Sequence, residues 1–223
     1  MKLKFQGHEA LNVEAGKVSV MLLNNTKEYF RLINCLNDNN DELVLFDDNY
    51  EIKEINRSVA WDADVVMNDA WQDKYVNLIL KQLSKQIIEP YRSAMQHEMQ
   101  RLCNVAQEGL YQYDLPLELD YFDNLLRIYK VLKVHVVPSA LSNPYGIILT
   151  DLKFHLELND CDVIALNNIG NYLTADEIRE LTAFVKDSGL ALLLIEFSEM
   201  SLRNKYGNAD VLYIDEDFID WHL

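Results

Sequence analysis

A stretch of about 35 residues constrains the fold more than any other part of the sequence, because it predicts a strand, a helix and a second strand in succession. Val163–Leu166 and Leu190–Ile195 are short apolar runs that are typical of buried strands. Between them, Thr174 stands three residues before Glu177, which is the spacing of a reciprocal helix-capping pair. Gly189 follows the last helical position, where a C-terminal cap is expected. Two strands joined by a helix in this way form a βαβ unit, which requires a parallel sheet covered by helices.

The beginning of the chain shows a similar succession of apolar runs and helical patterns. Val18–Leu23 is an apolar run fit for a buried strand, and Asn24–Thr26 follows as a capped turn. A helical apolar pattern then begins at Phe30, and Leu43–Phe46 supplies a further apolar run. We therefore expect the two ends of the chain to share one sheet.

The middle of the chain has a different character. Trp71–Leu110 contains one proline, Pro90, and predicts a long helix that this proline kinks or breaks. Tyr121–Val131 predicts another helix, and the alternation in Val131–Val137 predicts a strand. Asn143–Leu158 is ambiguous in its spacing, and its length favours a helix.

These elements together predict an α/β fold in a chain of 223 residues, which is long enough to bury a sizeable core. The predicted head is a parallel-sheet domain made of residues 1–65 and 138–223. A helical leg at residues 66–137 interrupts it. Neither a signal peptide nor a run of about 18 uncharged residues is present, so we expect a cytoplasmic protein that does not enter membranes.

The net charge of the chain is −16, from 20 Lys and Arg residues against 36 Asp and Glu residues. Such a charge repels polyanions on average, which excludes a simple basic nucleic-acid-binding module. The charge is segregated, however, because residues 74–101 and residues 124–150 each carry +3 and the remainder therefore carries −22. This segregation suits a protein that meets an anion on one surface only.

In a helix, four of the basic residues of the first segment would lie on one face. They are spaced by 7, 4 and 7 positions. An unbroken helix would place them within about 20° of one line that is roughly 27 Å long, opposite the apolar side chains. The alternatives are a phosphate-binding stripe and a solvated lysine face, and a helix that ends at Pro90 would remove Arg92 from the line. With the second basic segment, the candidate DNA-binding residues are Lys74, Lys81, Lys85, Arg92, Arg127, Lys130 and Lys133.

A second candidate site is the acidic segment at residues 114–123, which leads into a predicted helix. Several carboxylates on a short segment suit a hard cation with oxygen ligands, such as Ca²⁺. The spacing differs from that of an EF-hand, and a bare acidic loop is the alternative interpretation. The candidate metal ligands are Asp114, Glu118, Asp120 and Asp123.

Motifs of several enzyme classes are missing. The pair Gly16-Lys17 precedes the first predicted strand, whereas a phosphate loop must follow a strand and open a helix. His97-Glu98 begins like a zinc-protease helix, but Arg101 occupies the position of the second histidine. The three cysteines form no C-x-x-C pair and are interpreted as free buried thiols, and the five histidines as surface or structural residues. No catalytic residue is therefore predicted.

In sequence order, several segments resemble one known family. These are Leu173–Glu177, which opens a helix after an apolar strand, Leu192–Ser198 and Ile214–Phe218. An acidic chain of this length, with an α/β head split by a helical leg, resembles the CRISPR-associated Csn-two family. Its members are spacer-acquisition accessory proteins of type II-A systems.

This resemblance implies a homotetrameric ring that encircles double-stranded DNA, binds its ends without sequence preference and supports CRISPR spacer acquisition in antiviral defence. It implies a sheet like that of P-loop ATPases without the phosphate loop, Ca²⁺ bound by Asp114, Glu118, Asp120 and Asp123, and no enzymatic activity. The implied partners are DNA, the CRISPR integrase and the effector nuclease. Two alternatives stay open: a metal-dependent nuclease or phosphatase that uses the acidic segment, and an acidic protein–protein scaffold.

Overall fold

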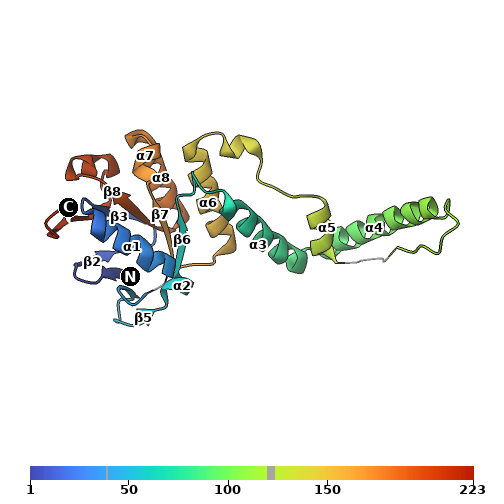
Figure 1. The fold of residues 1–223 in the computed structure, drawn as a ribbon, viewed down its shortest axis with the longest axis horizontal. Helices are drawn as coiled ribbons and strands as arrows, with labels where there is room; N and C mark the ends of the chain where they lie inside the picture. Colours follow the sequence, from blue (N-terminus) through green and yellow to red (C-terminus); the bar gives the residue numbers. More distant parts are fainter. Residues whose placement is uncertain (39, 120–123) are drawn as a thin grey trace. The chain divides into compact units, whose positions relative to one another are not determined.

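The computed structural model describes residues 1–38, 40–119 and 124–223 (Figure 1). The chain divides into two compact units, which are treated separately below. The head consists of Met1–Trp71 and Val137–Leu223, and the leg consists of Gln72–Val136. The boundaries expected from the sequence were 65/66 and 137/138.

The head is built on a six-stranded sheet with the order β10-β9-β3-β8-β7-β6. Its five strands from β9 to β6 are parallel, and β10 alone runs antiparallel at one edge. Strand β3 comes from the beginning of the chain and pairs with β8 and β9 from its end, which confirms that the two ends share one sheet. The strands are β3 (Lys17–Leu23), β6 (Val59–Ala63), β7 (Val163–Asn167), β8 (Ala191–Phe197), β9 (Asp210–Ile214) and β10 (Asp220–His222).

A second sheet of four antiparallel strands has the order β2-β1-β4-β5. Its strands are β1 (Lys2–Phe5), β2 (Ala10–Asn12), β4 (Leu43–Phe46) and β5 (Ile52–Lys53). The apolar run at Leu43–Phe46 thus forms a strand, but that strand pairs with β1 outside the parallel sheet. Leu3, Phe5 and Leu45 of this sheet share one buried core with Met21 and Ile195 of the parallel sheet.

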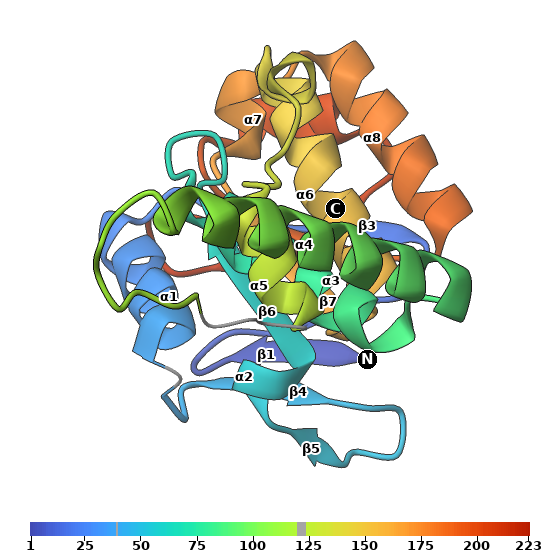
Figure 2. The same cartoon turned by 90° about the vertical axis from the view of Figure 1, so that its right-hand side faces the viewer.

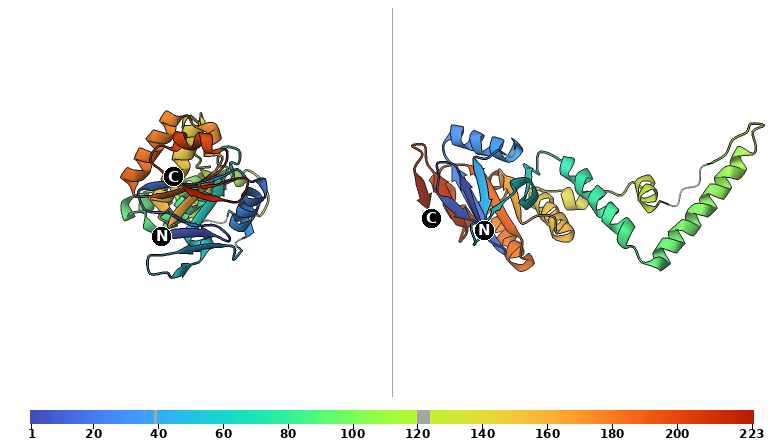
Figure 3. Two further views of the ribbon diagram at one scale, coloured as in Figure 1. Left: turned by 90° about the vertical axis from the view of Figure 1, so that its left-hand side faces the viewer. Right: turned by 90° about the horizontal axis from the view of Figure 1, so that it is seen from below.

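Helices complete both faces of the parallel sheet, so that the fold class is α/β as predicted. Helix α1 (Thr26–Asp38) adds Leu32 and Cys35 to the core that the two sheets share. Helices α6 (Pro144–Leu158) and α8 (Ala175–Ser188) lie on the opposite face (Figures 2 and 3). The short helical segments of the head are α2 (Ile55–Ser58), α7 (Ile169–Tyr172), and the 3₁₀ helices η1 (Pro138–Leu141) and η2 (Met200–Tyr206).

The local signals around α8 have the predicted structural effect. The Thr174 hydroxyl accepts a hydrogen bond from the Glu177 N–H at 3.2 Å, and a Glu177 carboxylate oxygen accepts one from the Thr174 N–H at 2.7 Å. Gly189 ends the helix with a φ of +74°, in the left-handed region where glycine has no steric penalty. The capping pair and the C-terminal glycine are confirmed.

The leg contains most of α3 (Ala70–Gln86), together with α4 (Glu89–Leu110) and α5 (Leu125–Val131). The predicted long helix breaks between Gln86 and Glu89, since Ile88 is extended and Pro90 stands in the first turn of α4. A proline is favourable in a first turn because its missing N–H has no helical partner there. No described helix combines the length and apolar character needed to cross a bilayer.

The strand expected at Val131–Val137 is wrong. Val131 ends α5, and the Leu132 N–H still bonds the Ile128 carbonyl oxygen at 3.0 Å. Lys133 has a φ of +52°, which is incompatible with an extended strand. The helix predicted for Tyr121–Val131 is present from Leu125 onward, and residues 120–123 lie outside the described ranges.

Candidate functional site

The exposed face of α3 carries part of the predicted basic stripe. Lys81 and Lys85 are one turn apart, so they lie on the same side of the helix, and both are exposed. Lys74 belongs to the same line, and its ammonium group lies 2.8 Å from the Tyr75 hydroxyl and 4.3 Å from the ring centre. Helix α3 therefore presents Lys81 and Lys85 to solvent and holds Lys74 against an aromatic ring.

Arg92 does not continue this line, which corrects the prediction of one four-residue stripe. The helix break places Arg92 on α4, where its Nε lies 3.6 Å from the Glu89 carboxylate. Its Nη2 donates to the backbone carbonyl oxygen of Ser84 at 3.2 Å. Because Ser84 belongs to the last turn of α3, Arg92 binds a carbonyl group that the helix end leaves open.

The second basic segment is located mainly on α5. Asn124 caps this helix by accepting hydrogen bonds from the N–H groups of Leu126 and Arg127. Arg127 and Lys130 are three residues apart and exposed, and α5 contains no acidic residue. Lys133 follows in the turn and is also exposed.

The described part of the acidic segment folds back along α4. The side chain of Gln107 donates to the Leu117 carbonyl oxygen at 3.1 Å and accepts from the Leu119 N–H at 2.8 Å. Glu118 lines a cavity of about 530 Å³ between this segment and α4, whereas Asp114 is exposed outside it.

A calcium site at this segment is not visible from the described residues. Ca²⁺ takes about six to eight oxygen ligands. Asp114 and Glu118 offer two exposed carboxylates, and Asp120 and Asp123 lie outside the described ranges. The calcium site therefore stays a prediction.

The carboxyl edge of the parallel sheet is where P-loop proteins bind phosphate, and this head lacks the loop for it. After β3, the Asn25 side chain accepts hydrogen bonds from the N–H groups of Lys27 at 3.0 Å and Glu28 at 3.2 Å. The asparagine thus occupies donors that a phosphate would need. The predicted absence of a phosphate loop agrees with this geometry.

Sequence analysis did not detect a buried polar network at the same edge. Glu196 at the end of β8 accepts a hydrogen bond from the Gly170 N–H at 2.9 Å. Asp64 accepts from the Tyr172 hydroxyl at 2.6 Å and from the Asn168 side chain at 3.0 Å. Burial, and to a lesser degree the charge of Asp64, raises the pKa of Glu196 to about 7, against the lowering effects of the Gly170 N–H and of Lys205. The only signal in the sequence is a glutamate directly after an apolar run.

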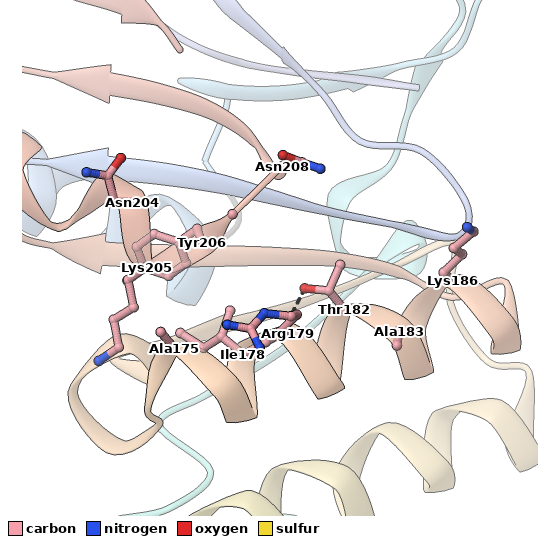
Figure 4. A pocket seen from close by; sticks show the side chains of 11 residues that line it. Ala175, Ile178, Arg179, Thr182, Ala183, Lys186, Asn204, Lys205, Tyr206 and Asn208 are labelled. Atoms are coloured by element: carbon pink, nitrogen blue, oxygen red, sulfur yellow. Dashed lines mark hydrogen bonds between the residues drawn. The ribbon is translucent and has the colours of Figure 1, made fainter.

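A cavity of about 440 Å³ between α8 and η2 carries another set of cations (Figure 4). Arg179, Lys186 and Lys205 belong to its lining, and Arg179 and Lys205 are engaged with the protein itself. Arg179 lies 2.8 Å from the Asp176 carboxylate, and the Lys205 ammonium donates to the Gly170 carbonyl oxygen. Two of its three cations are therefore engaged, and Lys186 alone adds less available positive charge than α3 and α5 do together.

The end of α6 gathers a titratable cluster that the sequence analysis also missed. His155 is buried, with Nε2 2.6 Å from Asp62 and Nδ1 3.0 Å from Asp160. Burial opposes the charged imidazolium, but the hydrogen bonds with Asp62, Cys161 and Asp160 and the charge of Asp151 outweigh it and raise the pKa of His155 to about 11. Of the three cysteines, Cys35 is buried as predicted, whereas Cys103 and Cys161 are partly exposed.

Comparisons with known proteins give one family and one solved structure of similar fold. The family model described as CRISPR-associated protein (Cas_Csn2) matches residues 36–218. The solved structure of Stu0660 of Streptococcus thermophilus is similar with a TM-score of 0.60 and 14% identity, over 100% of this chain and 76% of that one. Two ATP-binding cassettes of ABC transporters are more distant. MJ1267 in its ADP conformation has a TM-score of 0.44 and 13% identity, over 94% of this chain and 84% of that one. A nucleotide-free cassette has a TM-score of 0.45 and 11% identity, over 100% of this chain and 92% of that one. No curated protein matches the sequence.

Proposed function

Because the chain belongs to the Csn2 family of CRISPR-associated proteins, we propose that it is a non-enzymatic accessory protein that binds double-stranded DNA independently of sequence and supports spacer acquisition. The observation that carries this proposal is the exposed positive charge on helices α3 and α5 of the leg, in a chain of net charge −16. Its bearers are Lys81, Lys85, Arg127 and Lys130.

These four side chains differ from many other basic residues of the protein in forming no ion pair with a described acidic residue. Within the ranges that the structure describes, none of the four forms an ion pair, whereas Lys17, Arg57 and Arg101 each pair with a glutamate three residues before them. Unpaired cations on exposed helices can neutralise backbone phosphates without desolvating a partner carboxylate. The acidic remainder of the surface would keep DNA away from other faces.

A homotetrameric ring belongs to the same proposal. Helix α4 is 22 residues long and contains no buried residue, although it carries apolar side chains such as Tyr91, Leu102 and Val105. Exposed apolar side chains on a long helix favour association with a further copy of the leg. Four protomers around one duplex would add their phosphate contacts, which compensates for the small number of cations in each.

Ca²⁺ and the partner proteins complete the proposal. Ca²⁺ bound by Asp114 and Glu118, together with Asp120 and Asp123, would offset the repulsion between these carboxylates. The CRISPR integrase and the effector nuclease are the proposed partners, because the family is CRISPR-associated.

One experiment tests the central claim and its main rival. The protein is mixed with linear and with closed circular duplex of the same sequence, in the presence of Mg²⁺ or Mn²⁺, and both binding and DNA length are measured on gels. We expect preferential binding of the linear form and no change in length. Shortened DNA would establish a nuclease instead, and absence of binding to either form would favour a protein–protein scaffold.

A further inference from the structure

The C-terminal end of α6 places three different metal-binding side chains together. Asn159 ends the helix in the left-handed conformation, with its N–H bonded to the His155 carbonyl oxygen at 2.8 Å. This turn brings the next two residues, Asp160 and Cys161, back beside the His155 ring. The Nδ1 atom of His155 lies 3.0 Å from Oδ1 of Asp160 and 3.7 Å from Sγ of Cys161. The three atoms lie within 4.8 Å of one another.

The other ring nitrogen of His155 is oriented by a separate strand. Its Nε2 lies 2.6 Å from Oδ2 of Asp62, which is buried on β6. Histidines that bind metals commonly direct their second nitrogen to a carboxylate, which fixes the ring and increases the basicity of the coordinating nitrogen. The Asp62 contact therefore directs Nδ1 towards Asp160 and Cys161.

The separations of His155 Nδ1 from the other two atoms are close to those of tetrahedral coordination. Typical Zn²⁺ bonds of about 2.0–2.3 Å to nitrogen, oxygen and sulfur place tetrahedral ligand atoms about 3.3–3.6 Å apart. The observed separations of 3.0 Å and 3.7 Å bracket this range. The third pair, Asp160 Oδ1 and Cys161 Sγ, lies within 4.8 Å, so binding requires at most a small inward movement of these two side chains.

We propose that His155 Nδ1, Asp160 Oδ1 and Cys161 Sγ bind Zn²⁺, with Asp62 as the positioning residue behind the histidine. An imidazole and a thiolate favour Zn²⁺ over Ca²⁺ or Mg²⁺, which prefer oxygen ligands. A cavity of about 130 Å³ borders His155 and Cys161 and has room for a water molecule as the fourth ligand. On binding, the metal replaces the proton on Nδ1 and the thiol proton, and both are released to solvent.

This site is independent of the proposed DNA contacts and of the acidic segment. Its ligands come from α6 and from the two residues that follow the Asn159 cap, and its positioning residue comes from β6. A bound ion would fasten the end of α6 to the neighbouring strands of the head. We therefore expect a structural contribution, with no involvement in DNA binding.

Co²⁺ substitution of the untagged, EDTA-stripped full chain tests the proposal, because thiolate ligation gives Co²⁺ a charge-transfer absorption band. We expect this band in the unmodified protein and in the matched control Cys103→Ser, its loss in Cys161→Ser, and its persistence in excess Ca²⁺. Zn²⁺ should displace Co²⁺ with a stoichiometry of one per chain. Absence of the band from the unmodified protein, or its survival in Cys161→Ser, would overturn the assignment.

Two further variants separate ligation from folding. Asp160 is exposed, so Asp160→Asn should fold normally and still weaken Zn²⁺ binding. Asp62→Asn should lower the affinity by about 10- to 100-fold, as expected for a residue that orients a ligand. Thermal unfolding should shift upward with Zn²⁺ in the unmodified chain and stay constant in Cys161→Ser. Equal Zn²⁺ affinity in all these proteins would contradict the proposal.

Discussion

The backbone N–H of Gly170 donates a hydrogen bond of 2.9 Å to the buried carboxylate of Glu196. This contact joins the start of α7 to the carboxyl end of β8. The Tyr206 hydroxyl approaches Gly170 from η2, so that a Cβ atom at this position would lie 2.1 Å from the hydroxyl oxygen and 3.2 Å from Glu196 Oε2. The position therefore requires glycine because of close approach and not because of its φ angle.

Gly170→Ala is expected to destabilise the head. The added methyl group overlaps with Tyr206, which is buried and has little freedom to move. Overpacking of this kind costs about 1–3 kcal/mol in the free energy of unfolding, measured by urea denaturation. Gly109→Ala is the matched control, because Gly109 lies in α4 with open space around it. That control should be neutral or stabilising by up to about 1 kcal/mol, and an equal loss in both variants would refute the steric explanation.

Glu196 predicts a specific pH dependence of stability. Burial is the main cause that raises its pKa from 4.5 to about 7, so the folded protein binds this proton more tightly than the unfolded chain does. The contribution of this tighter proton binding to the free energy of unfolding is fully present below pH 4.5 and is lost as the pH rises to about 7. The loss is on the order of 3 kcal/mol.

Glu196→Gln removes the titrating group while keeping its shape. The free energy of unfolding is measured by urea denaturation for both proteins at pH 5 and at pH 8. The difference between the variant and the unmodified protein should be more favourable to the variant at pH 8 than at pH 5. Glu180→Gln, at an exposed position on α8, is the control and should show no such difference. If Glu196→Gln differs from the unmodified protein by the same free energy of unfolding at both pH values, this carboxylate does not cause the pH dependence of stability.

Local signals in the sequence predicted some elements, and non-local contacts decided others. The capping pair of Thr174 and Glu177 lies within one helical turn, and α8 begins where it predicts. The apolar run at Leu43–Phe46 forms a strand that pairs with β1, and an apolar run does not encode which strand it pairs with. The helix break before Pro90 was foreseen as an alternative, whereas the return of Arg92 to Ser84 depends on the new direction of α4.

In the candidate sites too, some features follow from local sequence and others from non-local contacts. Lys81 and Lys85 share a helical face through their spacing alone, so the sequence could place them. The His155 cluster could not be recognised in this way, because Asp62 lies 93 residues earlier and reaches the ring only through the folded sheet. Cys161 is six residues from His155, but only the left-handed Asn159 turns the chain enough for them to meet.

Removal of carboxylates should abolish Ca²⁺ binding at the acidic segment. The double variant Asp114→Asn/Glu118→Gln loses two of the four proposed ligands while keeping side-chain size. We expect calorimetric titration to show the loss of Ca²⁺ binding, because a hard cation depends on anionic oxygen ligands. The control Glu180→Gln/Asp187→Asn removes the same charge from exposed positions of α8 and should bind normally. Unchanged Ca²⁺ affinity in the first variant would place the ion elsewhere.

Charge reversal on α3 tests the DNA-binding surface. Lys81→Glu/Lys85→Glu should weaken binding to a linear duplex by roughly tenfold or more, because two phosphate contacts per protomer become repulsive. Fluorescence anisotropy at several salt concentrations should show a log–log slope that is shallower by about 2 for each protomer that contacts the duplex.

The control Lys2→Glu/Lys4→Glu makes the same charge change at two exposed positions of β1 in the head. It should retain both affinity and salt dependence, because these lysines lie outside the proposed surface. Light scattering should give the same molar mass for both variants, since neither replaces the apolar side chains of α4. Equal weakening by the two double variants would mean that net charge, and not the face of α3, governs DNA binding.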